Sequence, residues 1–217
     1  MAEKSGLTKM QVRRLVQAID ATHVDKKQGK LTYMAQHEVR AELTRIFGYG
    51  NWDAQTEEMA FLWESEINAG EPGYPKSPQS GNPPYYRACY MARVRVTIRD
   101  YWGNPVASFV GAHAEANSVL PDRGEAHAMA VSSVESYALR RAVISLGDRL
   151  GLGLYDGGSS AALVKGTLQL TDPESPLFVT DEEKAALRAE AEKKEADRMA
   201  RLQGAVNNTS GDGNAAG

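Results

Sequence analysis

One short stretch of the sequence alternates so regularly that it strongly limits the possible secondary structure. From Arg87 to Arg99 (RACYMARVRVTIR), every second residue is apolar or aromatic, and the positions between them include four arginines. Successive side chains on a β-strand point to opposite faces, so this stretch predicts a strand with one apolar and one basic face. Such a strand is typical of an antiparallel sheet that covers a core with one face.

Strand signals also flank this stretch on both sides. The segment from Trp52 to Ile67 predicts a half-buried strand, because large apolar residues occupy alternate positions: Met59, Phe61 and Trp63. The Gly- and Pro-rich segment from Asn68 to Pro84 predicts a long hairpin loop. The turn DYWGNP then leads into a third strand from about Val106 to Ala114, which completes an antiparallel meander.

Helical periodicity appears before and after the predicted sheet. Thr8 is placed to cap a first helix, and a second helix is predicted from about Ala35 to Phe47, with Gly48 as its C-terminal stop. A long third helix is predicted from about Ala126 to Leu150. The sequence therefore predicts an α+β fold, in which an antiparallel β-meander packs on a long helix (β-β-β-α) and is preceded by N-terminal helices.

The composition of the chain changes after the long helix. Residues 1–157 are predicted to form the folded core, and residues 158–180 a linker. Residues 181–203 carry mixed charges at helical spacing and predict a charged helix, whose apolar stripe is too thin to join a globular core. Residues 204–217 are small and polar, so we expect a disordered tail.

Positive charge is the clearest lead to function. The net charge of −3 means that any nucleic-acid site has to be local. One guanidinium group can donate two parallel hydrogen bonds to the oxygens of a phosphate, and it stays charged at any working pH. Clustered arginines are therefore candidates to line a groove for a polyanion. The alternative is that the strand arginines form a solvated sheet face, paired with nearby acids. The candidate groups are Arg140, Arg141, Arg93, Arg95, Lys26, Lys27 and Lys30.

Signatures of an enzyme are weak by comparison. His113 and Glu115 match the His-x-Glu element of zinc-dependent deaminases, but that chemistry also needs paired cysteines, and Cys89 is the one cysteine of the sequence. The glycine-rich runs lack the lysine-serine ending of a phosphate loop. We therefore expect a protein that is not an enzyme and uses no cofactor or metal. The alternative is a metal-dependent nucleic-acid-processing site at His113 and Glu115.

Two motifs give the chain a resemblance to a known family. FGYGNW, from Phe47 to Trp52, places an aromatic-glycine turn between a helix and the first strand, and RRAVISLG runs from Arg140 to Gly147. In this order around a β-meander, the motifs resemble the core of the Rad52 family of single-strand annealing proteins, from about Gly29 to Asp156. The resemblance implies a β-β-β-α core, assembly into rings or arcs, and a basic groove for single-stranded DNA.

The resemblance also implies specific DNA-binding residues. The family's inner site uses a tyrosine before the first core helix, matched by Tyr33, and a basic pair on the long helix, matched by Arg140 and Arg141. A third basic residue one turn later is Ile144 here. For the family's basic residue upstream of the tyrosine, His23 stands at the equivalent distance, and the alternatives Lys26, Lys27 and Lys30 are closer to Tyr33. The lysines of the family's outer site have only approximate counterparts in Arg87 and Arg123, so that site is not carried over.

The expected function is therefore binding of single-stranded DNA through its phosphates and ATP-independent annealing of complementary strands in homologous recombination or repair. The alternative is a single-strand-binding or scaffold protein of the same fold that does not anneal. The expected partners are single-stranded DNA, further copies of the chain in a ring or arc, and a host single-strand-binding protein. Since the sequence has no secretory signal and no long apolar span, we expect no membrane association and a cytoplasmic location, in a bacterial cell or a phage-infected host.

Overall fold

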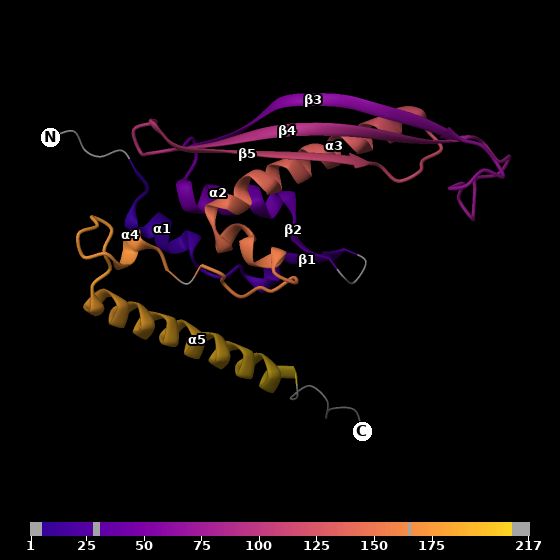
Figure 1. The fold of residues 1–217 in the computed structure, drawn as a ribbon. Helices are drawn as coiled ribbons and strands as arrows, with labels where there is room; N and C mark the ends of the chain where they lie inside the picture. The colour runs from indigo at the N-terminus through magenta and orange to yellow at the C-terminus, as the bar shows by residue number, and fades with distance from the viewer. Residues whose placement is uncertain (1–5, 28–30, 165, 210–217) are drawn as a thin grey trace, which may run out of the picture. The chain divides into compact units, whose positions relative to one another are not determined.

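The computed structural model describes residues 6–27, 31–164 and 166–209, and it confirms the predicted meander (Figure 1). Strand β3 (Trp52–Ile67) pairs with β4 (Tyr85–Arg99), which pairs with β5 (Pro105–Ala116), all antiparallel and in the order β3-β4-β5. On β4 the predicted alternation holds, because the apolar side chains are buried on one face: Ala88, Ala92, Val94, Val96 and Ile98. The chain divides into two units, Met1–Thr167 and Leu168–Gly217, and the sheet lies in the first.

Helix α3 (Arg123–Val143) packs on this apolar face, over β4 and β5. Its N-terminus is capped by Asp122, whose carboxylate accepts a hydrogen bond from the amide of Glu125 at 2.7 Å. The predicted helix to Leu150 is too long, because two 3₁₀ turns follow Val143: η2 (Ile144–Leu146) and η3 (Asp148–Leu150). Gly147 separates them at φ +139°, where a Cβ would lie 2.5 Å from the carbonyl oxygen of Leu15.

The N-terminal helices form as predicted. Helix α1 (Lys9–Leu15) begins with a reciprocal cap between Thr8 and Gln11, and α2 (Gln36–Phe47) ends at Gly48 with φ +85°. A 3₁₀ turn, η1 (Ala21–His23), and a hairpin of β1 (Val24–Lys27) and β2 (Leu31–Met34) connect the two helices. The hairpin was not predicted, because its strands are short and its lysine-rich segment has the composition of a loop.

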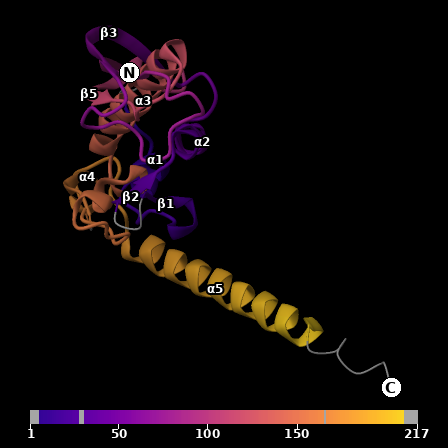
Figure 2. The same ribbon diagram turned by 90° about the vertical axis from the view of Figure 1, so that its right-hand side faces the viewer.

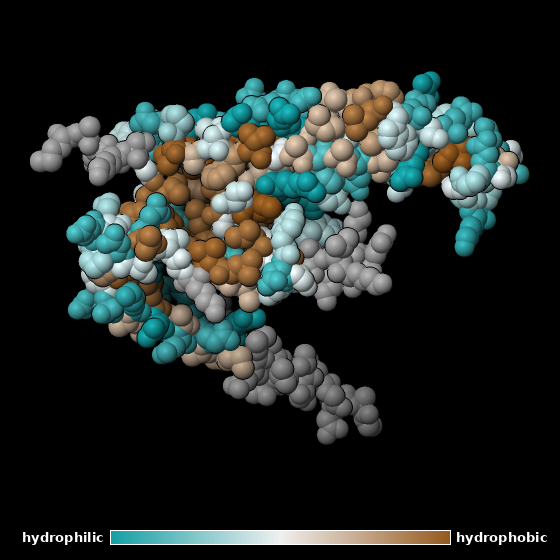
Figure 3. Space-filling view, viewed as in Figure 1, coloured by the Kyte–Doolittle hydropathy of each residue, from teal (hydrophilic) through white to brown (hydrophobic). Residues whose placement is uncertain are grey.

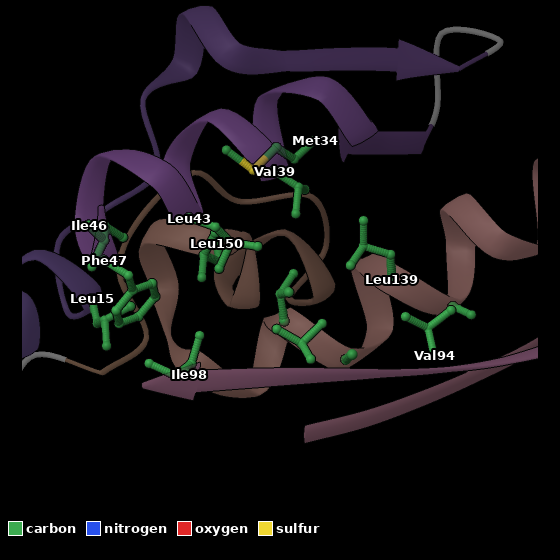
Figure 4. Close-up of a cluster of buried hydrophobic side chains, with 14 of the residues drawn as sticks. Leu15, Met34, Val39, Leu43, Ile46, Phe47, Val94, Ile98, Leu139 and Leu150 are labelled. Atoms are coloured by element: carbon green, nitrogen blue, oxygen red, sulfur yellow. The ribbon is translucent and has the colours of Figure 1, made fainter. Parts of the chain in front are cut away.

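The core lies between the sheet and helix α2 (Figure 4). Val94 and Ile98 point from the sheet toward α3, Leu139 belongs to α3, and the α2 side chains Val39 and Leu43 close the far side. All five side chains are buried. Hydrophobic residues of this unit are also exposed at its surface, below the sheet in the view of Figure 3.

Strand β3 differs from its predicted half-buried pattern. Met59, Phe61 and Trp63 are exposed by 37%, 53% and 43%, because α3 covers mainly β4 and β5. The register also shifts between Phe61 and Trp63. This bulge places Phe61 on the face that carries α3 and Trp63 on the opposite face, so the three residues do not form one stripe.

The first unit extends past residue 157, the predicted end of the folded core, because the segment that follows the 3₁₀ turns also belongs to it. The last of these turns is η4 (Leu152–Tyr155). The buried carboxylate of Asp148 then accepts hydrogen bonds from the backbone amides of Leu163, at 2.9 Å, and Val164, at 2.7 Å. These bonds hold Leu163 and Val164 against the core. We call this ordered beginning of the predicted linker the strap.

The second unit consists of a short helix and a long one. Helix α4 (Leu168–Thr171) precedes α5 (Asp181–Thr209), which Figure 2 shows as one uninterrupted helix. Residues 204–209, predicted to be disordered, continue α5, because extending an existing helix costs little once its first turns have formed. Residues 210–217 lie outside the described residues. Among the helices that the structure describes, none is long and apolar enough to cross a membrane.

Candidate DNA-binding surface

Arg140 is held between two aromatic rings. Its guanidinium carbon lies 5.0 Å from the ring centre of Tyr33, on β2, and 4.0 Å from that of Tyr137, one turn earlier on α3. Its Nη1 atom also donates to the carbonyl oxygen of Met34 at 3.5 Å. Cation–π contacts and this bond fix the orientation of the half-buried group before any ligand arrives.

Arg141 places a second positive charge beside the first. It is exposed, and its Nη1 atom donates to the carbonyl oxygen of Ala112 on β5 at 3.3 Å. The helix comes this close to β5 because Gly111 has no side chain: a Cβ there would collide with the backbone of Ala138 and Ala142. A single glycine therefore sets the position of the arginine pair on the sheet.

His113 extends the group along β5. Its ring centre lies 4.7 Å from that of Tyr137, and its Nε2 atom is 3.6 Å from Oε2 of Glu115. Burial, followed by the charge of Arg141, holds the pKa of His113 below its usual value, against the opposing effect of Glu115. We refer to the whole group as the Arg140 cluster, and it consists of Tyr33, His113, Glu115, Tyr137, Arg140 and Arg141.

The arginine pair has no acidic partner among the residues whose side chains the structure describes. Among the described residues, no carboxylate forms an ion pair with Arg140 or Arg141. The position of the family's third basic residue is taken by Ile144, the partly buried C-cap of α3. His23 is 3.5 Å from Glu38, measured from Nδ1 to Oε2.

Arg93 and Arg95 lie on the other face of the sheet. Arg93 pairs with Glu58 at 3.3 Å and Arg95 with Glu57, both on β3. Arg99 is paired as well, with Asp53. The structure therefore does not bring the strand arginines together with the Arg140 cluster, and their charges are matched by nearby acids.

Two of the candidate lysines, Lys26 and Lys27, belong to the hairpin that contains Tyr33. Lys26 is opposite Thr32 and Lys27 is opposite Leu31 in the β1–β2 pairing, and Asp25 is opposite Tyr33. The side chains of Lys26 and Lys27, and the whole of Lys30, lie outside the described residues. The backbone therefore places Lys26 and Lys27 on the same small hairpin as the tyrosine.

Tyr137 was not among the predicted site residues, although it carried a readable signal. It precedes Arg140 by three residues, the spacing at which side chains on a helix meet. His113 was considered only as a metal ligand. In the part of the chain that the structure describes, no group of three or more His, Cys, Asp or Glu residues is placed to hold a metal ion.

Comparison with protein families assigns the chain to a known family. A family model described as Rad52/22 family double-strand break repair protein matches residues 6–169. The chain belongs to this family. Membership in the Rad52/22 family makes it a protein of DNA repair and recombination and implies that it binds DNA. A search among curated proteins found no match to the sequence.

Proposed function

We propose that this Rad52/22 family member binds single-stranded DNA through its phosphates at the Arg140 cluster. The observation that carries the proposal is the pair of Arg140 and Arg141, which forms no ion pair within the described part of the chain and has one guanidinium already oriented by two rings. Such groups bind phosphate oxygens without reading base edges. Arg93, Arg95 and Arg99 of β4 contribute less, because acids on β3 already neutralise them.

The bound strand then anneals with its complement without nucleotide hydrolysis. Two complementary strands repel each other through their backbones, and neutralising the phosphates removes this barrier while the bases stay free to pair. Formation of a duplex is downhill, so no energy source and no enzymatic activity are required. The glycine-rich runs of the sequence also lack the lysine-serine ending of a phosphate loop.

Several copies of the chain act together in a ring or arc. Strand β3 is at an edge of the sheet and exposes Phe61, Leu62 and Trp63 by more than two-fifths each. Exposed apolar residues on an edge strand favour association with another protein surface. This assembly works in the cytoplasm of a bacterial cell or a phage-infected host, where a host single-strand-binding protein is the expected further partner.

A mixing experiment with two labelled complementary oligonucleotides tests annealing. An annealing protein accelerates duplex formation, whereas a protein that only protects single strands slows it. Product analysis after incubation with divalent metals tests the enzymatic alternative at His113 and Glu115, and cleaved or modified strands would establish it.

Replacement of Arg140 and Arg141 by Ala tests the site. If each arginine contacts one phosphate, the double variant binds a labelled oligonucleotide more weakly, and the plot of log K against log salt becomes shallower by about 1.4. The control is Lys193→Ala with Lys194→Ala, which removes the same charge from the exposed surface of α5. Equal affinity of the Arg140/Arg141 variant and the wild type would refute the site assignment.

A further inference from the structure

His113 lies among groups that make its protonation sensitive to a bound anion. It belongs to β5, and the side chains facing it come from the same strand and from α3: Glu115, Tyr137, Arg140 and Arg141. On β4, Ala92 is opposite His113, and Tyr90, opposite Glu115, bonds through its hydroxyl to His127. One carboxylate and two arginines therefore act on the charge of this ring.

In the absence of DNA, these surroundings favour the neutral ring. Burial and the charges of Arg141 and Arg140 lower the pKa of His113, and only Glu115 raises it. The Oε2 atom of Glu115 is buried and has no hydrogen-bond partner among the described residues, and Nε2 of His113 lies 3.6 Å away, just beyond bonding distance. A proton acceptor for a charged imidazole is thus already in place.

A bound phosphate weakens the electrostatic effects that oppose protonation of His113. A phosphate bound by the arginine pair brings a negative charge close to the ring, which offsets part of the positive charge that opposes protonation. The attraction of Glu115 is unchanged. The same event that fills the Arg140 cluster therefore stabilises the charged form of the ring.

We propose that His113 becomes the third cation of the Arg140 cluster when single-stranded DNA binds, so that binding takes up a proton at this ring. The inference rests on the proposed DNA-binding function. It adds a third positive charge from strand β5, on which α3 packs. By linkage, affinity for DNA rises as pH falls, by at most about tenfold per pH unit for one proton.

Binding of oligothymidylate measured between pH 6 and pH 8 at constant ionic strength tests the inference, because thymine does not titrate in this range. We expect the full-length wild type to bind about three- to tenfold more tightly at pH 6 than at pH 8. The His113→Gln variant should bind oligothymidylate with about the same affinity at pH 6 and at pH 8. The control, His37→Gln, removes an exposed histidine of α2 and should retain the wild-type ratio.

The ring itself gives a second readout. In nuclear magnetic resonance titrations, the pKa of His113 should be below its ordinary value in the free protein and should rise when oligothymidylate is present. Equal pH ratios in the wild type and His113→Gln, or an unchanged His113 titration on binding, would overturn the inference and leave the DNA-binding function standing. Absence of binding at every pH would overturn both.

Discussion

Glu42 on α2 is a buried carboxylate surrounded by arginines. Its Oε1 atom accepts from Nε of Arg149 at 2.6 Å and from Nε of Arg14 at 3.0 Å, and its Oε2 atom accepts from Nη1 of Arg45 at 2.9 Å. Burial alone would raise the pKa of Glu42, but the hydrogen bonds from Arg149 and Arg45 outweigh it and lower the pKa. This single residue ties α1, α2 and η3 together.

We expect Glu42→Gln to destabilise the protein by about 3–5 kcal/mol at neutral pH, because three arginines lose their counter-charge. Since the folded pKa is lowered, the stabilisation is present above the unfolded pKa and is lost as pH falls through the folded pKa. Urea denaturation at several pH values should therefore show the wild type and the variant converging in acid. Glu58→Gln, which breaks an exposed pair, should cost less than about 1 kcal/mol.

The ring of Tyr137 is expected to position Arg140 for phosphate. Tyr137→Ala should weaken binding of single-stranded DNA about three- to tenfold, because the guanidinium loses its nearer cation–π contact of about 1 kcal/mol. Tyr137→Phe keeps the ring and should bind like the wild type in a fluorescence anisotropy titration. Tyr49→Ala, at an exposed tyrosine of the turn after α2, is the control. Equal losses in the Ala and Phe variants would contradict the positioning role.

At the scale of single residues, the sequence led to part of the candidate site. The arginine pair could be predicted from the helix motif and Tyr33 from the family resemblance, and the structure places the guanidinium of Arg140 over the ring of Tyr33. His113 could not be assigned to this group, because its neighbours on α3 are brought close only by the packing of the helix on β5. Arg93 and Arg95 share a face with each other, but periodicity alone does not show that Glu58 and Glu57 of β3 lie beside them and neutralise them.

At the scale of elements, the contact between α3 and β5 depends on Gly111. We expect Gly111→Ala to destabilise the protein by about 1–3 kcal/mol, because the added methyl group forces the helix away from the strand. The same shift should weaken DNA binding by displacing Arg141 from Ala112. Thermal unfolding and a DNA titration measure both effects. Ala114→Val, at an exposed position on the other face of β5, should change neither.

Element types were easier to predict than their exact ends. Strong alternation identified β4, and glycine signals identified the end of α2. The end of α3 at Val143 could not be predicted, because it depends on the approach of Leu15, far away in sequence, to Gly147. The bulge in β3 could not be predicted either, since one extra residue turns Trp63 to the opposite face of the sheet without changing the order of hydrophobic residues in the sequence.

At the scale of the whole molecule, the exposed residues of β3 predict self-association. We expect Leu62→Ser with Trp63→Ser to lower the native mass of the protein in solution, because the apolar contact with a neighbouring copy is lost. Native mass spectrometry measures the change. Trp102→Ser, at an exposed position in the β4–β5 turn, is the control and should retain the wild-type mass. An unchanged mass in the β3 variant would refute this interface.

The strap at Asp148 has a consequence for the order in which the chain folds during synthesis. A growing chain that has emerged as far as Gly151 already carries the whole meander and α3, but the Asp148 carboxylate has neither of its amide partners. Burying a carboxylate without those bonds is costly, so the region around Asp148, just after α3, cannot pack fully until Leu163 and Val164 have been synthesised. The packing of the core is therefore completed by Leu163 and Val164, which the ribosome adds after the residues of the core itself.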